Sequence, residues 1–337
     1  MSATATATGA APRLLADIGG TNARFAWQAQ AGAAVEQVRT LSCADHATLD
    51  HAIQRYLQDT GQPVPPACAI AIATAVVGDQ VAMTNHHWAF SIAALKAQLG
   101  LQQLLVINDF TALALALPSL QPDETWQLGG TAARPGWAIG LIGPGTGLGV
   151  SGLLPDGRGG WLPLQGEGGH ATMAGTTARE CAVLALLTQW HGHASAERAV
   201  SGPGLVDIHR ALGVLDGLPE QTASPTAADI TSAALEGSDA RSLETLELFC
   251  AYLGIAAGNL ALALGAKGGV YIGGGIVPRL GHWFTRSAFR ERFEAKGRLS
   301  SFLHEIPVFV IDARSSPAFL GAANALDSSA PFEGWAR

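Results

Sequence analysis

Two short glycine turns, each set between apolar segments, constrain the fold of this chain more than any other feature of its sequence. The first turn is Gly19-Gly20-Thr21-Asn22, between the apolar run Arg13 to Ile18 and the extended pattern of Ala23 to Trp27. Apolar runs of this length that are bounded by glycine are typical of β-strands. The segment therefore predicts a strand, a tight turn and a second strand.

The same arrangement returns about 125 residues further along the chain. Ala138 to Ile142 is an apolar run, Gly143 to Gly149 is rich in glycine, and Val150 to Leu154 is apolar again. Glycine lets the backbone approach phosphate oxygens closely, so each turn offers N–H groups to a ligand. The repeat predicts two duplicated halves that serve a shared ligand.

Segments between and after the turns alternate between strand and helix patterns, which predicts an α/β protein. Further strands are expected at Ala67 to Ala75, Leu104 to Ile107, Val270 to Ile272 and Ile306 to Ile311. Helices are expected at Leu49 to Leu57, Ile92 to Leu99, Thr111 to Leu117, Ala178 to Trp190, Ala227 to Leu235, Leu243 to Leu264 and Pro317 to Leu326. Pro118 stops one of these helices and is the expected boundary of the first lobe.

Length and charge limit the classes of function. A chain of 337 residues favours two lobes with a cleft between them over one core. A net charge of −7 disfavours nucleic acid, because binding to its backbone needs clustered Lys and Arg. The sequence contains no unbroken apolar stretch of about 18 residues, so no membrane span is expected. Met1 to Pro12 is interpreted as a frayed tail, because it lacks the basic and apolar regions of a signal peptide. We expect a cytoplasmic protein.

The four cysteines, Cys43, Cys68, Cys181 and Cys250, are widely separated and form no C-x-x-C pair. Zinc and redox sites use such pairs, so the cysteines are interpreted as buried free thiols in a reducing compartment.

Asp17 adds a carboxylate to the first glycine turn. A carboxylate next to a phosphate makes sense only with a divalent cation or its waters between them, which points to magnesium nucleotide. The alternative is an ordinary hairpin turn.

In the second turn, Gly145-Thr146-Gly147, the threonine hydroxyl is a candidate donor to a phosphate. Gly273-Gly274-Gly275, after a strand, is a candidate to lie against adenosine, or is simply a tight turn into a helix.

Two better-known phosphate motifs do not apply. Gly147 to Gly152 fits G-x-G-x-x-G, but no helix follows to hold a pyrophosphate, so NAD binding is not expected. A Walker A sequence is absent.

A second group of polar residues has the chemistry to bind a sugar. Asn108 and Asp109 follow a predicted strand, where α/β proteins present functional groups, although Asp109 is equally placed to be a helix N-cap. Glu167 and His170 lie on a glycine-rich loop, and Glu197 precedes another glycine-rich segment. The alternatives are a surface loop with a satisfied histidine and an exposed helical glutamate. Carboxylates and amides recognise sugar hydroxyls, and phosphoryl transfer needs alignment, magnesium and a base at the attacking hydroxyl.

Taken together, these segments resemble the bacterial glucokinase family, the non-ROK, enterobacterial-type branch of the hexokinase and actin-like ATPase fold. The segments that carry the resemblance are ADIGGTNAR from Ala16, AMTNHHWAFS from Ala82, INDFTA from Ile107, GTGLGV from Gly145, GEGGH from Gly166, AERAVSGPGLV from Ala196 and GGGIVPR from Gly273. The resemblance spans nearly the whole chain.

The resemblance implies a two-lobed, ribonuclease H-like fold, with a smaller α/β lobe of residues 1–118 plus roughly 311–337. Residues 119–310 would form a larger α/β lobe with added helices. It implies ATP-dependent phosphorylation of glucose to glucose 6-phosphate, the first step of cytoplasmic glycolysis, by a homodimer. Asp109 would be the general base, and Asn108, Glu167, His170 and Glu197 would bind glucose. The nucleotide segments would be Asp17 to Asn22, Gly145 to Gly147 and Gly273 to Gly275.

Some features limit what the resemblance implies. Ala171 to Thr177 departs from the family pattern just after His170, which puts the support of that histidine in doubt. Ala171 to Glu180 contains no cysteine, unlike the sister group with a structural zinc, so zinc is not expected. Another hexose kinase, a sugar sensor and an actin-like ATPase remain as alternatives. The sensor is disfavoured because only about 13 residues precede the first strand, too few for a DNA-binding module.

Overall fold

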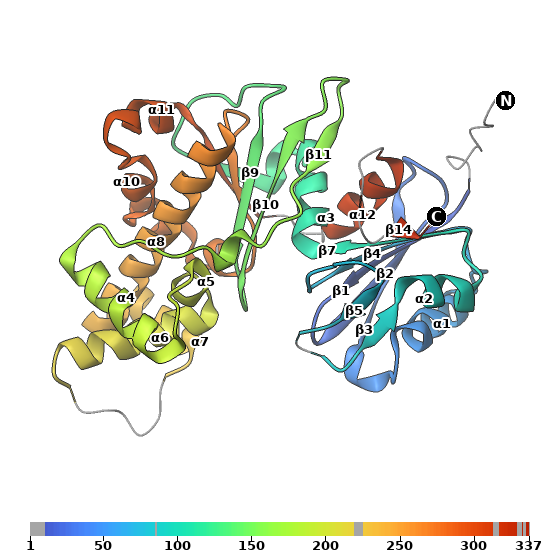
Figure 1. The fold of residues 1–337 in the computed structure, drawn as a ribbon, viewed down its shortest axis with the longest axis horizontal. Coiled ribbons are helices and arrows are strands. Elements are labelled where there is room, and N and C mark those ends of the chain that lie inside the picture. The colour runs from blue at the N-terminus through green and yellow to red at the C-terminus, as the bar shows by residue number, and fades with distance from the viewer. Residues whose placement is uncertain are drawn as a thin grey trace. The chain divides into compact units, whose positions relative to one another are not determined.

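In the computed structural model the chain forms two compact units (Figure 1). The structure describes residues 11–84, 86–218, 225–312, 317–328, 332 and 335–336. The first unit comprises Met1–Leu120, Asp156–Gln165 and Arg314–Arg337, and the second comprises Gln121–Pro155 and Gly166–Ala313. Residues 156–165, which the sequence analysis assigned to the larger lobe, thus cluster with the first unit. Most of the predicted N-terminal tail lies outside the described residues.

The first unit is built on a twisted sheet whose central strands are parallel. Its strands follow the order β14 (Trp335–Ala336), β7 (Gln103–Asn108), β4 (Ala67–Ile72), β1 (Arg13–Ile18), β2 (Asn22–Gln28) and β3 (Val35–Ser42). β4 is parallel to both β1 and β7, whereas β2 and β14 are antiparallel to their neighbours. The register aligns Ile18, Ile72 and Asn108, so these three strands end at the same edge.

Helices cover both faces of this sheet, since its central strands are apolar on both sides. Alternate residues such as Leu14, Ile70 and Val106 pack in one core cluster with α1 (Leu49–Thr60) and α2 (Ile92–Leu99). On the other face, α12 (Pro317–Asp327) packs against α3 (Asp109–Ala116), β1 and β4. The unit also contains β5 (Gln80–Ala82), β6 (Ala89–Ser91) and β11 (Trp161–Pro163). The predicted C-terminal helix is confirmed.

An ion pair fastens α12 to the edge of the first strand. The guanidinium of Arg13, of which 3% is exposed, donates to both carboxylate oxygens of Asp327, at 2.9 and 2.6 Å. Gly321 lies directly against the backbone of Ala112 in α3, so any side chain there would overlap its carbonyl. The close approach of the two helices depends on this glycine.

The second unit repeats the central strand order of the first. Five of its strands follow the order β10 (Leu148–Pro155), β9 (Ile139–Pro144), β12 (Val270–Ile272), β13 (Val308–Ile311) and β8 (Thr125–Leu128). β9 is antiparallel to β10 and parallel to β12, β12 is parallel to β13, and β8 is antiparallel. The same pattern of parallel and antiparallel neighbours is found in the first sheet, through β2, β1, β4, β7 and β14. The duplication predicted from the two turns is therefore confirmed in the topology.

Added helices distinguish the second unit. They are α4 (Ala178–His191), α5 (Ala196–Ala199), α6 (Gly202–Leu215), α7 (Ala227–Glu236), α8 (Ala240–Leu264), α9 (Ile276–Leu280), α10 (Phe289–Glu294) and α11 (Ser300–Glu305). By length and composition α8 would suffice to cross a membrane, with a mean hydropathy of 1.6 over its most apolar window. However, 67% of that window is buried, as is usual for a helix in a protein core.

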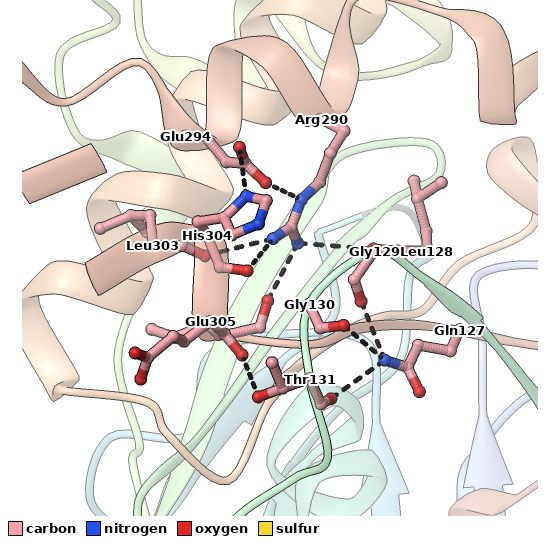
Figure 2. Close-up of polar contacts among 11 residues, drawn as sticks. Gln127, Leu128, Gly129, Gly130, Thr131, Arg290, Glu294, Leu303, His304 and Glu305 are labelled. Carbon is pink, nitrogen blue, oxygen red and sulfur yellow. Dashed lines mark hydrogen bonds and ion pairs between the residues drawn. The ribbon is translucent and has the colours of Figure 1, made fainter. Parts of the chain in front are cut away.

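Arg290 joins three segments of the second unit (Figure 2). Its Nε donates to Glu294 at 2.5 Å, and its Nη atoms donate to the carbonyls of Leu303, His304, Ile306 and Leu128. The last carbonyls of a helix have no partner within the helix. Arg290 satisfies these groups at the end of α11 and so fixes α10, α11 and the end of β8 together.

The structure corrects some sequence-based predictions. Cys181 is exposed, whereas Cys43, Cys68 and Cys250 are buried free thiols as expected. The second glycine turn is shorter than predicted, since β9 and β10 remain paired through Gly143 and Gly149 and only residues 145–147 form the turn. Because glycine also adopts the strand conformation, the glycine content alone overestimated the length of the turn.

Candidate active site

The first glycine turn follows directly on the end of β1. Its conformation is closed by a hydrogen bond from Gly19 N to the Asn22 carbonyl, at 2.9 Å. Behind the turn, Cys43 N donates to the Thr21 carbonyl at 2.9 Å, and Cys43 Sγ donates to the Gly19 carbonyl at 3.4 Å. Thr21 and Asn22 are exposed, as a phosphate-binding turn requires. No sequence signal indicated the supporting role of Cys43, which lies more than 20 residues away.

Asp17 and Asp109 lie at the same edge of the first sheet. Burial raises the pKa of the Asp109 carboxyl to about 6, and the negative charge of Asp17 adds to this shift. A hydrogen bond from Phe110 N, at 2.9 Å, opposes it. Both carboxylates are partly exposed. Asp109 is therefore a carboxylate that can take up a proton near neutral pH.

The alternative that Asp109 is the helix N-cap is wrong. Asn108 occupies that position, and its Oδ1 accepts from Phe110 N at 2.9 Å and from Thr111 N at 3.3 Å. The Nδ2 of Asn108 donates to the Thr74 carbonyl at 3.3 Å. Asn108 thus fixes the start of α3 and leaves Asp109 in the first turn of the helix.

The second glycine turn has a different support. Gly145 N donates to the Gly147 carbonyl at 2.8 Å within the turn. From outside, Gly202 N at the start of α6 donates to the Gly145 carbonyl at 2.8 Å. Thr146, at the tip, is exposed. The tip therefore presents its backbone and one hydroxyl.

Glu167 and His170 are both exposed, on a short 3₁₀ turn that packs against β10. Gly168 lies against the side chain of Val150, and Gly169 lies so close to the Leu148 carbonyl that a side chain at either position would collide. The two glycines allow the loop to sit flat on the strand, with Glu167 and His170 projecting from it. The loop is thus exposed, as the alternative of a surface loop has it, and the strand beneath supports it.

Glu197 is brought close to this loop by a short paired segment. Met173 N donates to the Ala194 carbonyl at 2.9 Å, and Ala196 N donates to the Ala171 carbonyl at 2.8 Å. The segment that departs from the family pattern after His170 thereby forms a direct connection to Glu197. Glu197 itself is half-buried and accepts a hydrogen bond from Leu148 N at 3.0 Å, so it is not a free helical surface residue.

A buried carboxylate behind this segment escaped the sequence analysis. Glu180 is 1% exposed and accepts from Thr176 N at 2.6 Å, Thr177 N at 3.1 Å and Arg292 at 3.0 Å. Burial alone would raise the pKa of Glu180, but the bonds from Thr176 and the charge of Arg292 hold it below its ordinary value. The sequence signal was the capping-box pattern of Thr177 and Glu180.

The third glycine segment lies beside the second turn. Gly273 N donates to the Ile142 carbonyl at 2.8 Å. Gly274 has a φ of 77°, and a Cβ atom there would overlap the Pro144 carbonyl. Gly275 caps the start of α9. The second unit therefore gathers Gly145 to Gly147 and Gly273 to Gly275 at one end of β9.

Within the described ranges, no group of three or more His, Cys, Asp or Glu side chains is arranged to hold a metal ion. Magnesium usually needs only one or two carboxylates besides the phosphates of a nucleotide. Asp17, at the end of β1, is a carboxylate of that kind.

Known proteins resemble this chain over most of its length. The family profile described as Glucokinase matches residues 14–329. A glucokinase of Aromatoleum aromaticum is 53% identical over 94% of this chain and 95% of its own length.

Among solved structures, a glucokinase from an Antarctic psychrotroph has a TM-score of 0.85 and 36% identity, covering 94% of this chain and 99% of its own. A ROK family glucokinase of Streptomyces griseus, solved with glucose and AMPPNP, has a TM-score of 0.60 and 18% identity, covering 93% and 98%. At that identity the likeness shows the fold alone, and it supports the predicted actin-like ATPase fold. The sequence and profile matches identify the family within this fold, and they show that this chain belongs to the glucokinase family.

Proposed function

We propose that this member of the glucokinase family transfers the γ-phosphoryl group of ATP to the 6-hydroxyl of glucose. The observation that carries the proposal is the environment of Asp109. Its carboxyl lies at the carboxyl ends of the parallel strands β7, β4 and β1, the sheet edge that also carries Asp17 and the first glycine turn, and its pKa is raised to about 6. A general base is most effective when its pKa lies near the working pH.

In the proposed reaction Asp109 accepts the proton of the 6-hydroxyl as the oxygen attacks the γ-phosphorus. The new bond joins O6 to phosphorus, the bond from phosphorus to the β,γ-bridging oxygen breaks, and ADP leaves with that oxygen. Asn108, Glu167, His170 and Glu197 bind the other hydroxyls and hold the 6-hydroxyl in line.

The glycine segments serve the nucleotide in this proposal. The backbone N–H groups of Asp17 to Asn22 and of Gly145 to Gly147 bind the phosphates, Thr146 adds a hydroxyl, and Gly273 to Gly275 lie against adenosine. Mg²⁺ that arrives with ATP would neutralise phosphate charge. Asp17 would hold that ion through water, which explains a carboxylate so close to a phosphate turn.

Further parts of the proposal concern the cell. We propose a cytoplasmic homodimer that acts in the first step of glycolysis, with neither nucleic acid nor membrane as a partner. The net charge of −7 disfavours nucleic acid as a partner, and the free thiols favour a reducing compartment. The homodimer and the place in glycolysis rest on the family alone.

A coupled assay with a panel of sugars and phosphoryl donors tests the proposal. We expect glucose to stimulate ATP consumption and glucose 6-phosphate to accumulate in equal amount. ATP consumption without stimulation by any sugar would support an actin-like ATPase instead. Sugar binding without turnover would support a sensor, and a preference for mannose or glucosamine would make the chain another hexose kinase.

A further inference from the structure

The carboxylate of Glu197 contacts the second glycine turn directly. Its Oε2 accepts the hydrogen bond from Leu148 N, the first residue after the turn, at 3.0 Å. Within the described part of the chain no hydrogen bond is made to its other oxygen, Oε1. One oxygen of Glu197 is therefore engaged by the turn, and the other can accept from a ligand hydroxyl.

The backbone around Glu197 holds the same turn from its other side. Gly202 N donates to the Gly145 carbonyl at 2.8 Å. Ser195 and Ser201 cap α5 and α6, with hydrogen bonds from Arg198 N at 3.3 Å and Gly204 N at 3.0 Å. Both serines are at most 5% exposed, so this segment is well fixed. The turn is thus held at its start by Gly202, the first residue of α6, and at its end by Glu197 of α5.

Gly147 shows how tightly the carboxylate covers the turn. Neither Gly145 nor Gly147 has a left-handed φ, so the backbone alone does not require glycine at either position. A Cβ atom on Gly147 would nevertheless overlap Oε2 of Glu197, whereas a Cβ on Gly145 would have no atom within 4 Å. A side chain at position 147 would therefore displace the carboxylate of Glu197, whereas one at position 145 would not.

We propose that Glu197 is a positioning residue for the phosphate turn as well as a ligand of the sugar, and that it couples the two substrates. The inference rests on the proposed function. A sugar hydroxyl on Oε1 restricts the carboxylate, and the restricted carboxylate holds Leu148 N and the turn in place for the phosphates. Coupling of this kind is reciprocal, so the conformation of the turn must also affect the binding of glucose.

The decisive experiment measures glucose binding without nucleotide in the Gly147→Ala and Gly145→Ala variants, by calorimetry. Both substitutions add one methyl group to the same turn, but only that at Gly147 displaces Glu197. We expect Gly147→Ala to weaken glucose binding about tenfold or more, as for a lost charged hydrogen bond. Gly145→Ala should change it less than about twofold. Equal glucose affinity in the Gly147→Ala variant and the wild type would overturn the inference.

Two further variants decide the question if Gly147→Ala fails to fold. In Glu197→Gln an amide oxygen can still accept from Leu148 N, but in Glu197→Ala nothing can. We expect the KM for ATP at saturating glucose to rise about tenfold in Glu197→Ala and to return to within about twofold of the wild type in Glu197→Gln. Equal KM values for ATP in both variants would refute a role at the turn.

The behaviour of the wild-type protein distinguishes a failure of this inference from a failure of the proposed function. If the wild type binds no glucose, both the proposed function and the inference are refuted. If it binds and phosphorylates glucose but the variants behave alike, only the coupling through Glu197 falls.

Discussion

The two glycine turns occupy equivalent places in the two sheets but are supported by different chemistry. Each joins a central strand to an antiparallel neighbour, β1 to β2 and β9 to β10. The first turn is backed by the neutral thiol and backbone of Cys43, whereas the second is backed by the carboxylate of Glu197 and by the start of α6. Duplication of the fold did not preserve the residues behind the turns.

The strand before each turn differs in the same way. β1 brings Asp17 to its end, near Asp109, while β9 ends in Gly143 and Pro144 and carries no charge there. Acid–base and magnesium chemistry is thus assigned to the first unit. The second unit has most of the residues assigned to the sugar, Glu167, His170 and Glu197, and two of the three glycine segments assigned to the nucleotide. This division predicts that variants of the two units fail in different kinetic parameters.

The largest effect is expected from Asp109→Asn. Loss of the base should lower kcat by about 10²–10⁴-fold, whereas Asn retains the size of the side chain and should leave glucose binding within a few-fold. The matched variant in the second unit is Glu167→Gln, which should raise the KM for glucose more than it lowers kcat. Steady-state kinetics with glucose and ATP varied in turn measure both. A normal kcat in Asp109→Asn would refute the assignment of the base.

Much of this division could be predicted from the sequence, because it depends on local patterns. Both strand–turn–strand units, the helix predicted at Thr111 to Leu117 and the C-terminal helix were visible in apolar spacing and in glycine positions. The edge strand β3 was missed because its residues are mostly exposed and give no apolar run. The supports of the turns were missed for a different reason. Cys43 and Gly202 act through backbone contacts with residues far away in the sequence, and such contacts leave no local pattern.

The next largest effect concerns the glycines at the end of β9. Gly274→Ala should destabilise the protein by about 2 kcal/mol or more, because alanine is strained at a left-handed φ and its Cβ would overlap the Pro144 carbonyl. Gly275→Ala is the control, since φ there is −94° and the nearest atom lies 3.9 Å from the added Cβ. It should cost less than about 1 kcal/mol. Urea unfolding of the two variants measures the difference, and equal midpoints would contradict it.

A smaller effect is expected on the pH dependence of catalysis. Asp109 acts as a base only when ionised, and its pKa is raised to about 6, so kcat/KM for glucose should fall as the pH drops through about 6. Asp17→Asn removes a negative charge near Asp109 and should lower that pKa, which moves the acid limb to lower pH.

The shift caused by Asp17→Asn should be less than about one pH unit, because burial, the larger cause, remains. The pH profile of kcat/KM at saturating ATP measures it separately from any loss of magnesium binding. An acid limb that moves to higher pH, or that stays in place, would show that the charge of Asp17 does not act on the base.

The smallest effect is expected from Cys43→Ala, which tests the support of the first glycine turn. The thiol contact to the Gly19 carbonyl is weak at 3.4 Å, and the stronger contact, from Cys43 N to Thr21, does not involve the side chain. We therefore expect a change in the KM for ATP of less than about threefold, with stability lowered by about 1 kcal/mol. An increase as large as that expected for Glu197→Ala would mean that both turns depend on a side chain behind them. The difference between the units would then lie only in the carboxylates of the first sheet.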